Sequence, residues 1–309
     1  MSRMAVTGAL GFSGRHIAAR LIDAGHEIVN LTNHPRRPDP FRGALSSESL
    51  AFDDPKGLAT SLRGVDTLFN TYWVRFAHGG VDHGIAVRNS TVLFNAAANA
   101  GVRRIVHVSI ANADAMSRLP YHRGKARVEQ ALALAGPSYA ILRPAVLFGD
   151  EPILVNSIAW LLRRFPFFAI AGDGQYGIQP THVEDLADLA VARGATSESS
   201  IEDAGGPEVF SFDEFVGLVR AAVSSRALIV HVPPSWVLLA AKMVHPLVRD
   251  VLITREEIEG LAAGLLVSRQ QPLGHRRFSE WVADAGPWLG RRYLSEVGRH
   301  FDRPLAHRA

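Results

Sequence analysis

The residues Val6-Thr7-Gly8-Ala9-Leu10-Gly11-Phe12-Ser13-Gly14 form a glycine-rich turn near the start of this 309-residue chain. Before the turn, Met4 to Thr7 is an apolar run typical of a buried strand. After it, apolar residues recur from Ile17 to Ile22 at the spacing of one helix face, and Gly25 closes the segment. His26 to Thr32 then reads as a second strand. This order predicts a right-handed βαβ unit with two adjacent parallel strands.

Alternating strands and helices continue through the first 150 residues. Further strands are expected at 50–52, 65–70, 105–109 and 139–142, and helices at 58–62, 85–100 and 121–134. The pattern predicts an α/β fold, a doubly wound parallel sheet of the Rossmann type, followed by a smaller C-terminal substrate region. We expect residues 1–150 to form the dinucleotide-binding core, with returning elements near 178–204 and 227–232, and residues 151–309 to form mainly the substrate-binding and helical region.

The glycine spacing of the opening turn suits a diphosphate. Gly8 permits the tight turn, Gly11 lets the backbone approach the ligand, and Gly14 lets the helix pack close to the strand. The helix N-terminus adds free N–H groups and a positive dipole. The alternative is an ordinary glycine turn. The candidate cofactor contacts in this loop are Gly8, Leu10, Gly11, Phe12, Ser13 and Gly14.

The residues after the second strand favour NADP over NAD. An NAD site usually places a carboxylate there to bind the ribose, but this chain has Thr32-Asn33-His34. Arg36 and Arg37 follow, and a guanidinium can bind a 2′-phosphate through paired hydrogen bonds, although arginines in a loop are often merely solvated. Asn33 is a further candidate contact. Asp53 is a candidate for the adenine edge or a solvated turn carboxylate.

Tyr121 and Lys125 lie four residues apart on an expected helix and therefore project from one face. A neighbouring ammonium lowers the pKa of a phenol by favouring phenolate, which makes tyrosine an acid/base near neutral pH. The chain contains only three lysines, so a lysine at this spacing is a specific signal.

Together the motifs resemble the short-chain dehydrogenase/reductase superfamily, in its extended or atypical branch with the NAD-dependent epimerase/dehydratases. Within that branch the chain is most similar to NAD(P)-binding proteins related to an accessory subunit of respiratory complex I. The resemblance implies that Tyr121 is the acid/base, that Lys125 binds the nicotinamide ribose, that Asn70 and Thr71 line the cofactor cleft, and that Pro144 lies beside the nicotinamide. It rests on Thr7-Gly8-x-x-Gly11-x-x-Gly14, Gly64-Val65-Asp66, Tyr121-x-x-x-Lys125, Arg143-Pro144 and His182-Val183-Glu184-Asp185-Leu186-Ala187.

One position departs from the family pattern. Family enzymes carry Ser or Thr as the second residue of a pair after the fifth strand, whereas Ser109 is followed here by Ile110. Ser109 serves as the third catalytic group, Ser117 replaces it, or the group is missing. Two hypotheses follow. The first is an oxidoreductase that transfers hydride between nicotinamide and a carbonyl or alcohol carbon, either as the whole reaction or within an epimerase or dehydratase cycle. The second is a non-catalytic NADP(H)-binding protein that acts as a redox sensor or as a structural partner of a larger assembly.

Composition limits the other partners. Lys and Arg number 33 against 30 Asp and Glu, without a basic stripe, which argues against nucleic acid. There is no cysteine, and the 13 histidines form no HExxH motif, so we expect no metal. The N-terminus shows no secretion signal and no segment is apolar enough to span a membrane, which favours a cytoplasmic protein with a small-molecule substrate.

Two surface contacts remain open. The aromatic group near Arg163 and Arg164 is expected to be core, with a substrate pocket or a membrane-facing patch as alternatives. A homodimer through the helices near Ile85 and Tyr121 is a family-level expectation. The aromatic group consists of Trp160, Phe165, Phe167 and Phe168.

Overall fold

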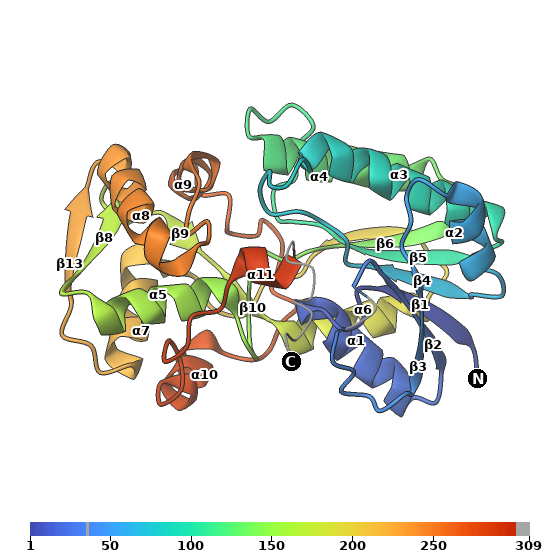
Figure 1. The fold of residues 1–309 in the computed structure, drawn as a ribbon, viewed down its shortest axis with the longest axis horizontal. Coiled ribbons are helices and arrows are strands. Elements are labelled where there is room, and N and C mark those ends of the chain that lie inside the picture. The colour runs from blue at the N-terminus through green and yellow to red at the C-terminus, as the bar shows by residue number, and fades with distance from the viewer. Residues whose placement is uncertain (35–36, 301–309) are drawn as a thin grey trace, which may run out of the picture. The chain divides into compact units, whose positions relative to one another are not determined.

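The computed structural model describes residues 1–34 and 37–300, which form two compact units (Figure 1). The first unit contains Met1–Pro144 and Val183–Ala204, and the second contains Ala145–His182 and the described residues from Gly205 onward. The chain thus leaves the first unit after Pro144 and returns to it for one helix and one strand.

A seven-stranded parallel sheet is the centre of the first unit, in the order β11-β6-β5-β4-β1-β2-β3. The strand order reverses between β1 and β4. Strand β1 pairs with β2 on one side and with β4 on the other, so that Ala5 lies opposite both Val29 and Leu68. Such a switch point is where open α/β sheets bind ligands, beyond the carboxyl ends of the strands. The strands are β1 (Arg3–Thr7), β2 (Glu27–Thr32), β3 (Leu45–Ser49), β4 (Thr67–Asn70), β5 (Arg104–Val108), β6 (Ser138–Arg143) and β11 (Ser200–Asp203).

Helices cover both faces of this sheet, as Figure 1 shows. On one face α1 packs against α6, and on the other α3 packs against both α2 and α4. Apolar residues from the sheet and from α2, α3 and α4 form a continuous buried core under the second group. The α/β prediction is confirmed. The helices are α1 (Phe12–Asp23), α2 (Pro55–Ser61), α3 (His83–Asn99), α4 (Pro120–Ala133) and α6 (Val183–Gly194).

The return of α6 and β11 is fixed by a buried arginine. Arg104 in β5 is 3% exposed, and its guanidinium donates to the carbonyls of Arg193 and Glu198 and to the Thr196 hydroxyl. These bonds tie the end of α6 and the following loop to the sheet.

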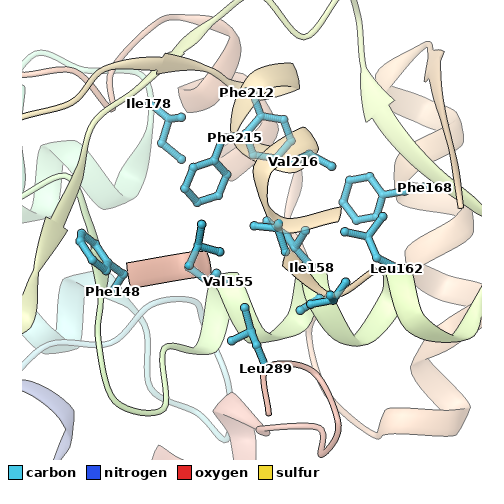
Figure 2. Packing of buried hydrophobic residues seen from close by; sticks show 14 of the residues in the cluster. Phe148, Val155, Ile158, Leu162, Phe168, Ile178, Phe212, Phe215, Val216 and Leu289 are labelled. Carbon is cyan, nitrogen blue, oxygen red and sulfur yellow. The ribbon is translucent and has the colours of Figure 1, made fainter. Parts of the chain in front are cut away.

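The second unit has its own core between α5, α7 and α10 (Figure 2). Phe148, Phe215 and Phe278 are almost fully buried there, and the Phe215 and Phe278 rings stack 4.5 Å apart. Three two-stranded ladders border the core. The elements are β7 (Val146–Phe148), α5 (Ile153–Arg164), β8 (Phe167–Ala171), β9 (Gly177–Ile178), β10 (Pro180–His182), β12 (Phe210–Ser211), α7 (Phe212–Ala222), β13 (Leu228–Val232), α8 (Pro234–Val248), α9 (Arg255–Ala262), α10 (Phe278–Ala285) and α11 (Glu296–His300).

Two sequence predictions need correction. The third strand is 45–49, not 50–52, because its polar, exposed residues lack the apolar signature of a buried strand. Residues 227–232 do not return to the main sheet, since β13 pairs with β8 in the second unit. The aromatic group was expected to be core, which is confirmed for Trp160 and Phe168 at 5% and 9% exposure, whereas Phe167 is 57% exposed.

Among the described helices, none combines the length and apolar character needed to cross a bilayer.

Candidate functional site

The glycine loop between β1 and α1 has the close backbone packing that only glycine allows. Gly8 has a φ of 64°, in the left-handed region, and its carbonyl accepts a 2.7 Å hydrogen bond from the Gly11 amide. A Cβ at Gly11 would lie 3.0 Å from the Gly8 oxygen, and a Cβ at Gly14 only 2.2 Å from it. The loop therefore folds back on itself and presents backbone N–H groups at the start of α1.

Buried asparagines fix this loop to the sheet. The Asn30 Oδ1 accepts from the Ala9 amide at 2.9 Å, and the Thr7 hydroxyl donates to Asn70 Oδ1 at 3.0 Å. The Thr7 Oγ1 in turn accepts from the amide of Thr71 at 2.7 Å. Since Asn70 is fully buried and its oxygen is engaged, we assign its side chain to positioning this loop instead of touching the cofactor.

Behind Asn70 lies a buried histidine. Asn70 Nδ2 and His107 Nδ1 are 3.0 Å apart, so with the amide donating, the imidazole proton is on Nε2. That Nε2 has no hydrogen-bond partner among the described residues. Burial first, and then the charge of Lys125, lower the pKa of His107 well below its usual value, so the ring is neutral.

Arg37 is next to the glycine loop. Its Nη1 lies 3.9 Å from the position that a Cβ at Gly11 would occupy, and burial lowers its pKa from the usual value. A cation beside the loop can form charge-assisted hydrogen bonds with a phosphate of a nucleotide bound there. Arg36, the other candidate, lies outside the described residues.

Asn33 and Asp53 both line one pocket, which has a volume of about 440 Å³. Phe52 forms part of its wall, and its ring centroid lies 4.7 Å from that of Tyr72. The Tyr72 hydroxyl accepts a 2.9 Å hydrogen bond from Asn89, which also lines the pocket. An apolar wall with polar groups at its edge is suited to a flat heteroaromatic ring such as adenine.

Tyr121 and Lys125 stand on α4, and one aromatic side chain contacts both. The Trp73 ring meets Tyr121 edge-on at a centroid distance of 5.7 Å, and the Lys125 Nζ lies 4.7 Å from the Trp73 centroid. Trp73 also stacks on His83, with ring planes 9° apart. Gly124 makes room for the indole, since a Cβ there would lie 2.8 Å from Trp73 Cη2. The Thr71 hydroxyl donates to the Thr7 carbonyl just before Gly8, so the segment from Thr71 to Trp73 links the glycine loop to the Tyr–Lys pair.

Lys125 is buried in a weakly polar setting. It is 3% exposed and its Nζ donates a 2.9 Å hydrogen bond to the Val108 carbonyl. Burial lowers its pKa from 10.5 to about 7, and the charge of Glu129 opposes this shift. The lysine can thus gain or lose its proton near neutral pH.

Ser109 is engaged with a different partner. Its hydroxyl donates to Glu129 Oε1 at 2.5 Å, and Arg143 forms an ion pair with the same carboxylate. The next residue, Ile110, is buried. The other candidate, the Ser117 hydroxyl, accepts from the Leu119 amide just before α4. Pro144 is buried at the end of β6, where its carbonyl accepts from the Ala111 amide.

Sequence reasoning missed Trp73 and Glu129. Glu129 continues the spacing of Tyr121 and Lys125 by another four residues, a signal that was readable on the helix face. Trp73 sits in a loop after β4, and nothing in local spacing indicates that its ring reaches α4.

Known proteins similar to this chain include nucleotide-binding proteins. A family model described as NAD(P)H-binding matches residues 8–158. The alpha subcomplex subunit 9 of mitochondrial NADH dehydrogenase from Arabidopsis thaliana is 26% identical over 294 residues, which cover 85% of this chain and 70% of that protein. An uncharacterised protein of Mycobacterium tuberculosis is 31% identical over 190 residues, 61% of this chain, and the match covers 20% of that relative.

An enzyme and a solved structure extend the comparison. A (4-alkanoyl-5-oxo-2,5-dihydrofuran-3-yl)methyl phosphate reductase of Streptomyces griseus is 26% identical over 292 residues, 90% of this chain and 96% of the reductase. An NADPH-dependent quinone oxidoreductase of Escherichia coli, solved with NADPH, has a TM-score of 0.74 over 91% of this chain and 99% of that chain. At 21% identity, that structure shows a shared fold.

Proposed function

We propose, from the match of residues 8–158 to the NAD(P)H-binding family model, that this chain is an NADP(H)-dependent oxidoreductase acting on a carbonyl or alcohol carbon. The observation that carries the proposal is the placement of Tyr121 and Lys125 on one face of α4, joined to the glycine loop by the segment Thr71 to Trp73. A nucleotide site and an acid/base pair thus belong to one connected set of residues.

The residues around the glycine loop fit an NADP molecule. The loop, closed by the contacts of Gly11 and Gly14 with Gly8, would bind the diphosphate, and the pocket beside Phe52 would take the adenine. Arg37, next to Gly11, would bind the 2′-phosphate, which supports NADP over NAD. When bound, the nicotinamide supplies or accepts the hydride.

Tyr121 would donate a proton to the substrate oxygen in reduction and remove it in oxidation. A phenol does this when its hydroxyl is within hydrogen-bond reach of that oxygen. Lys125 would stabilise the phenolate left behind, because an ammonium close to Tyr121 favours the anionic form. The Trp73 indole excludes water from the lysine and thereby strengthens this electrostatic effect.

The test is the replacement of Tyr121 by Phe, which keeps the ring and removes the hydroxyl. We expect the variant to bind NADPH as the wild type does and to lose NADPH oxidation with a panel of aldehydes, ketones and quinones. An unchanged oxidation rate in Tyr121→Phe would remove Tyr121 from the acid/base role.

A second function, cofactor binding without turnover, is favoured by one specific observation. Ser109 donates to Glu129 and is followed by buried Ile110, so neither residue offers a substrate a hydroxyl. A protein of this kind would serve as a redox sensor or as a structural partner in an assembly. It would bind NADPH with the expected affinity and oxidise none of it with any carbonyl of the panel.

A further inference from the structure

Helix α8 in the second unit exposes a ridge of large apolar side chains. None of its residues, all of them described, is buried. Four of them recur at intervals of three or four residues and are therefore on one side of the helix. They are Trp236, Leu239, Met243 and Leu247, between 53% and 75% exposed.

The ridge continues onto the sheet beneath the helix. Phe167 and Leu228 are register partners in β8 and β13 and are 57% and 59% exposed. Side chains alternate between the two faces along a strand, so Leu228 and its partner Phe167 lie on the face opposite to His231. The His231 imidazole contacts Asp213 of α7 on that other face. Helix α8 therefore packs on the face that carries Phe167 and Leu228. It leaves these two side chains, at the edge of the ladder, exposed.

The direction of α8 brings the two parts together. Only Pro233 separates β13 from α8, so the helix folds back over the ladder and its C-terminal end returns to the start of the strands. Figure 1 shows α8 beside β8 and β13. We call the six residues Phe167, Leu228, Trp236, Leu239, Met243 and Leu247 the α8 surface.

The charged residues within and on either side of α8 in the sequence are mostly positive. Residues 215–249 contain no Asp or Glu. Exposed Arg226 precedes Leu228, Lys242 lies within α8, and Arg249 ends the helix. The nearby Asp250 is 1% exposed and accepts hydrogen bonds from Tyr293 and the Glu296 amide, so it adds little to this surface. Exposed carboxylates stand nearby in α9, at Glu256 and Glu259, and in the turn after β8, at Asp173, whose neighbour Gly172 donates to the Val232 carbonyl. The cations are therefore set against few exposed acidic groups.

We propose that the α8 surface binds an anionic lipid bilayer, with α8 lying flat in the interface. Its 15 residues span about 22 Å, too short to cross the hydrocarbon layer but suited to lie along its edge. Trp236 has the amphipathic ring favoured at the headgroup level. Arg226, Lys242 and Arg249 complement acidic headgroups. A second copy of the chain would present the same cations and repel them.

The test is co-sedimentation of the full chain with vesicles of phosphatidylcholine containing phosphatidylglycerol, and with phosphatidylcholine alone. We expect binding to the anionic vesicles, weakened by salt. The double variant Trp236→Glu/Met243→Glu should bind about tenfold more weakly or worse, and Lys242→Glu should bind more weakly than the wild type. Met116→Glu, which changes an 88% exposed residue in the first unit, should bind as the wild type does.

Circular dichroism and molar mass measurements accompany the vesicle assay. The variants should keep the wild-type spectrum, because the changed side chains are exposed. Wild-type protein that stays in solution with anionic vesicles overturns the proposal. A second outcome also overturns it: the wild type is a dimer, and Trp236→Glu/Met243→Glu is a monomer that still binds vesicles as the wild type does. The α8 surface would then be a contact between copies of the chain.

Discussion

The Lys125 Nζ lies 4.7 Å from the centroid of the Trp73 ring, with its hydrogen bond directed to the Val108 carbonyl. An ammonium in this position is removed from water and faces the negative face of an indole. The same indole ring contacts Tyr121 edge-on, so Trp73 touches both the lysine ammonium and the proposed acid/base.

The burial of Lys125 predicts a pH-dependent stability. Its pKa is about 7 in the folded chain and near 10.5 in water. Between these values the unfolded chain carries a proton that the folded chain has released, so the free energy of unfolding rises with pH across this window. Below pH 7 both states are protonated and the burial penalty is complete.

We therefore expect Lys125→Met to flatten this rise and to stabilise the protein most below pH 7. Urea unfolding at several pH values from roughly 6 to 10 measures the effect. Lys56→Met, at an exposed lysine of α2, is the matched control and should leave the slope unchanged. Parallel curves for wild type and Lys125→Met would contradict the buried, low-pKa lysine.

Replacing Trp73 should expose Lys125. Trp73→Ala opens the ammonium to water, so we expect the pKa of Lys125 to rise and the pH window of the stability change to narrow from its lower edge. Trp73→Phe keeps an aromatic face and should shift the window less. The same urea series checks both variants. An identical window in Trp73→Ala would show that the indole does not desolvate the lysine.

Gly14→Ala tests the packing of the glycine loop. The new Cβ would lie 2.2 Å from the Gly8 carbonyl oxygen, so the backbone must move. We expect a loss of about 2 kcal/mol in the free energy of unfolding and NADPH binding weaker by about tenfold or more. Gly217→Ala in α7 has open space around its Cβ and should stabilise slightly. Calorimetric titration with NADPH that gives wild-type affinity for Gly14→Ala would disprove the role of the loop.

Arg37→Ala tests the choice of cofactor. Charge-assisted bonds to a phosphate contribute about 1.5–3 kcal/mol, so NADPH affinity should fall about tenfold to a hundredfold while NADH affinity stays the same. The exposed Arg88 supplies the control, since Arg88→Ala removes a cation from α3 and not from the segment after β2. Equal losses for NADPH and NADH would place Arg37 away from the 2′-phosphate.

Ser109→Ala separates structure from catalysis. Because the hydroxyl donates to buried Glu129, its loss should cost about 1 kcal/mol of stability. We expect turnover to change little, and the same for Ser117→Ala, whose hydroxyl caps the loop before α4. Thermal unfolding and steady-state rates, measured together, decide the matter. A large fall in rate at unchanged stability in Ser109→Ala would restore it as the third catalytic group.

Much of the fold was readable from local patterns. The glycine loop and the alternation of strands and helices are short-range signals, and the structure contains both. The strand at 45–49 escaped because its Ser and Glu residues are exposed at the sheet edge, where no apolar pattern is required.

The site was less predictable because its decisive contacts join distant segments. The family resemblance implied that Asn70, at the end of β4, lines the cofactor cleft. In the structure its side chain is buried, and its amide oxygen accepts a hydrogen bond from the Thr7 hydroxyl. Trp73 reaches Lys125 across 52 positions of sequence, through a loop whose path no periodicity encodes. Such contacts depend on tertiary packing, which spacing alone does not determine.

The most direct test of the central claim follows the hydride itself. NADPH carrying deuterium at the transferring carbon is incubated with the protein and the carbonyl panel, and the products are examined by mass spectrometry. We expect deuterium on the product carbon with the wild type. With Tyr121→Phe we expect the rate to fall by about a hundredfold or more while NADPH affinity is unchanged. Wild-type protein that binds NADPH and transfers no deuterium to any member of the panel would contradict the oxidoreductase assignment and favour binding without turnover.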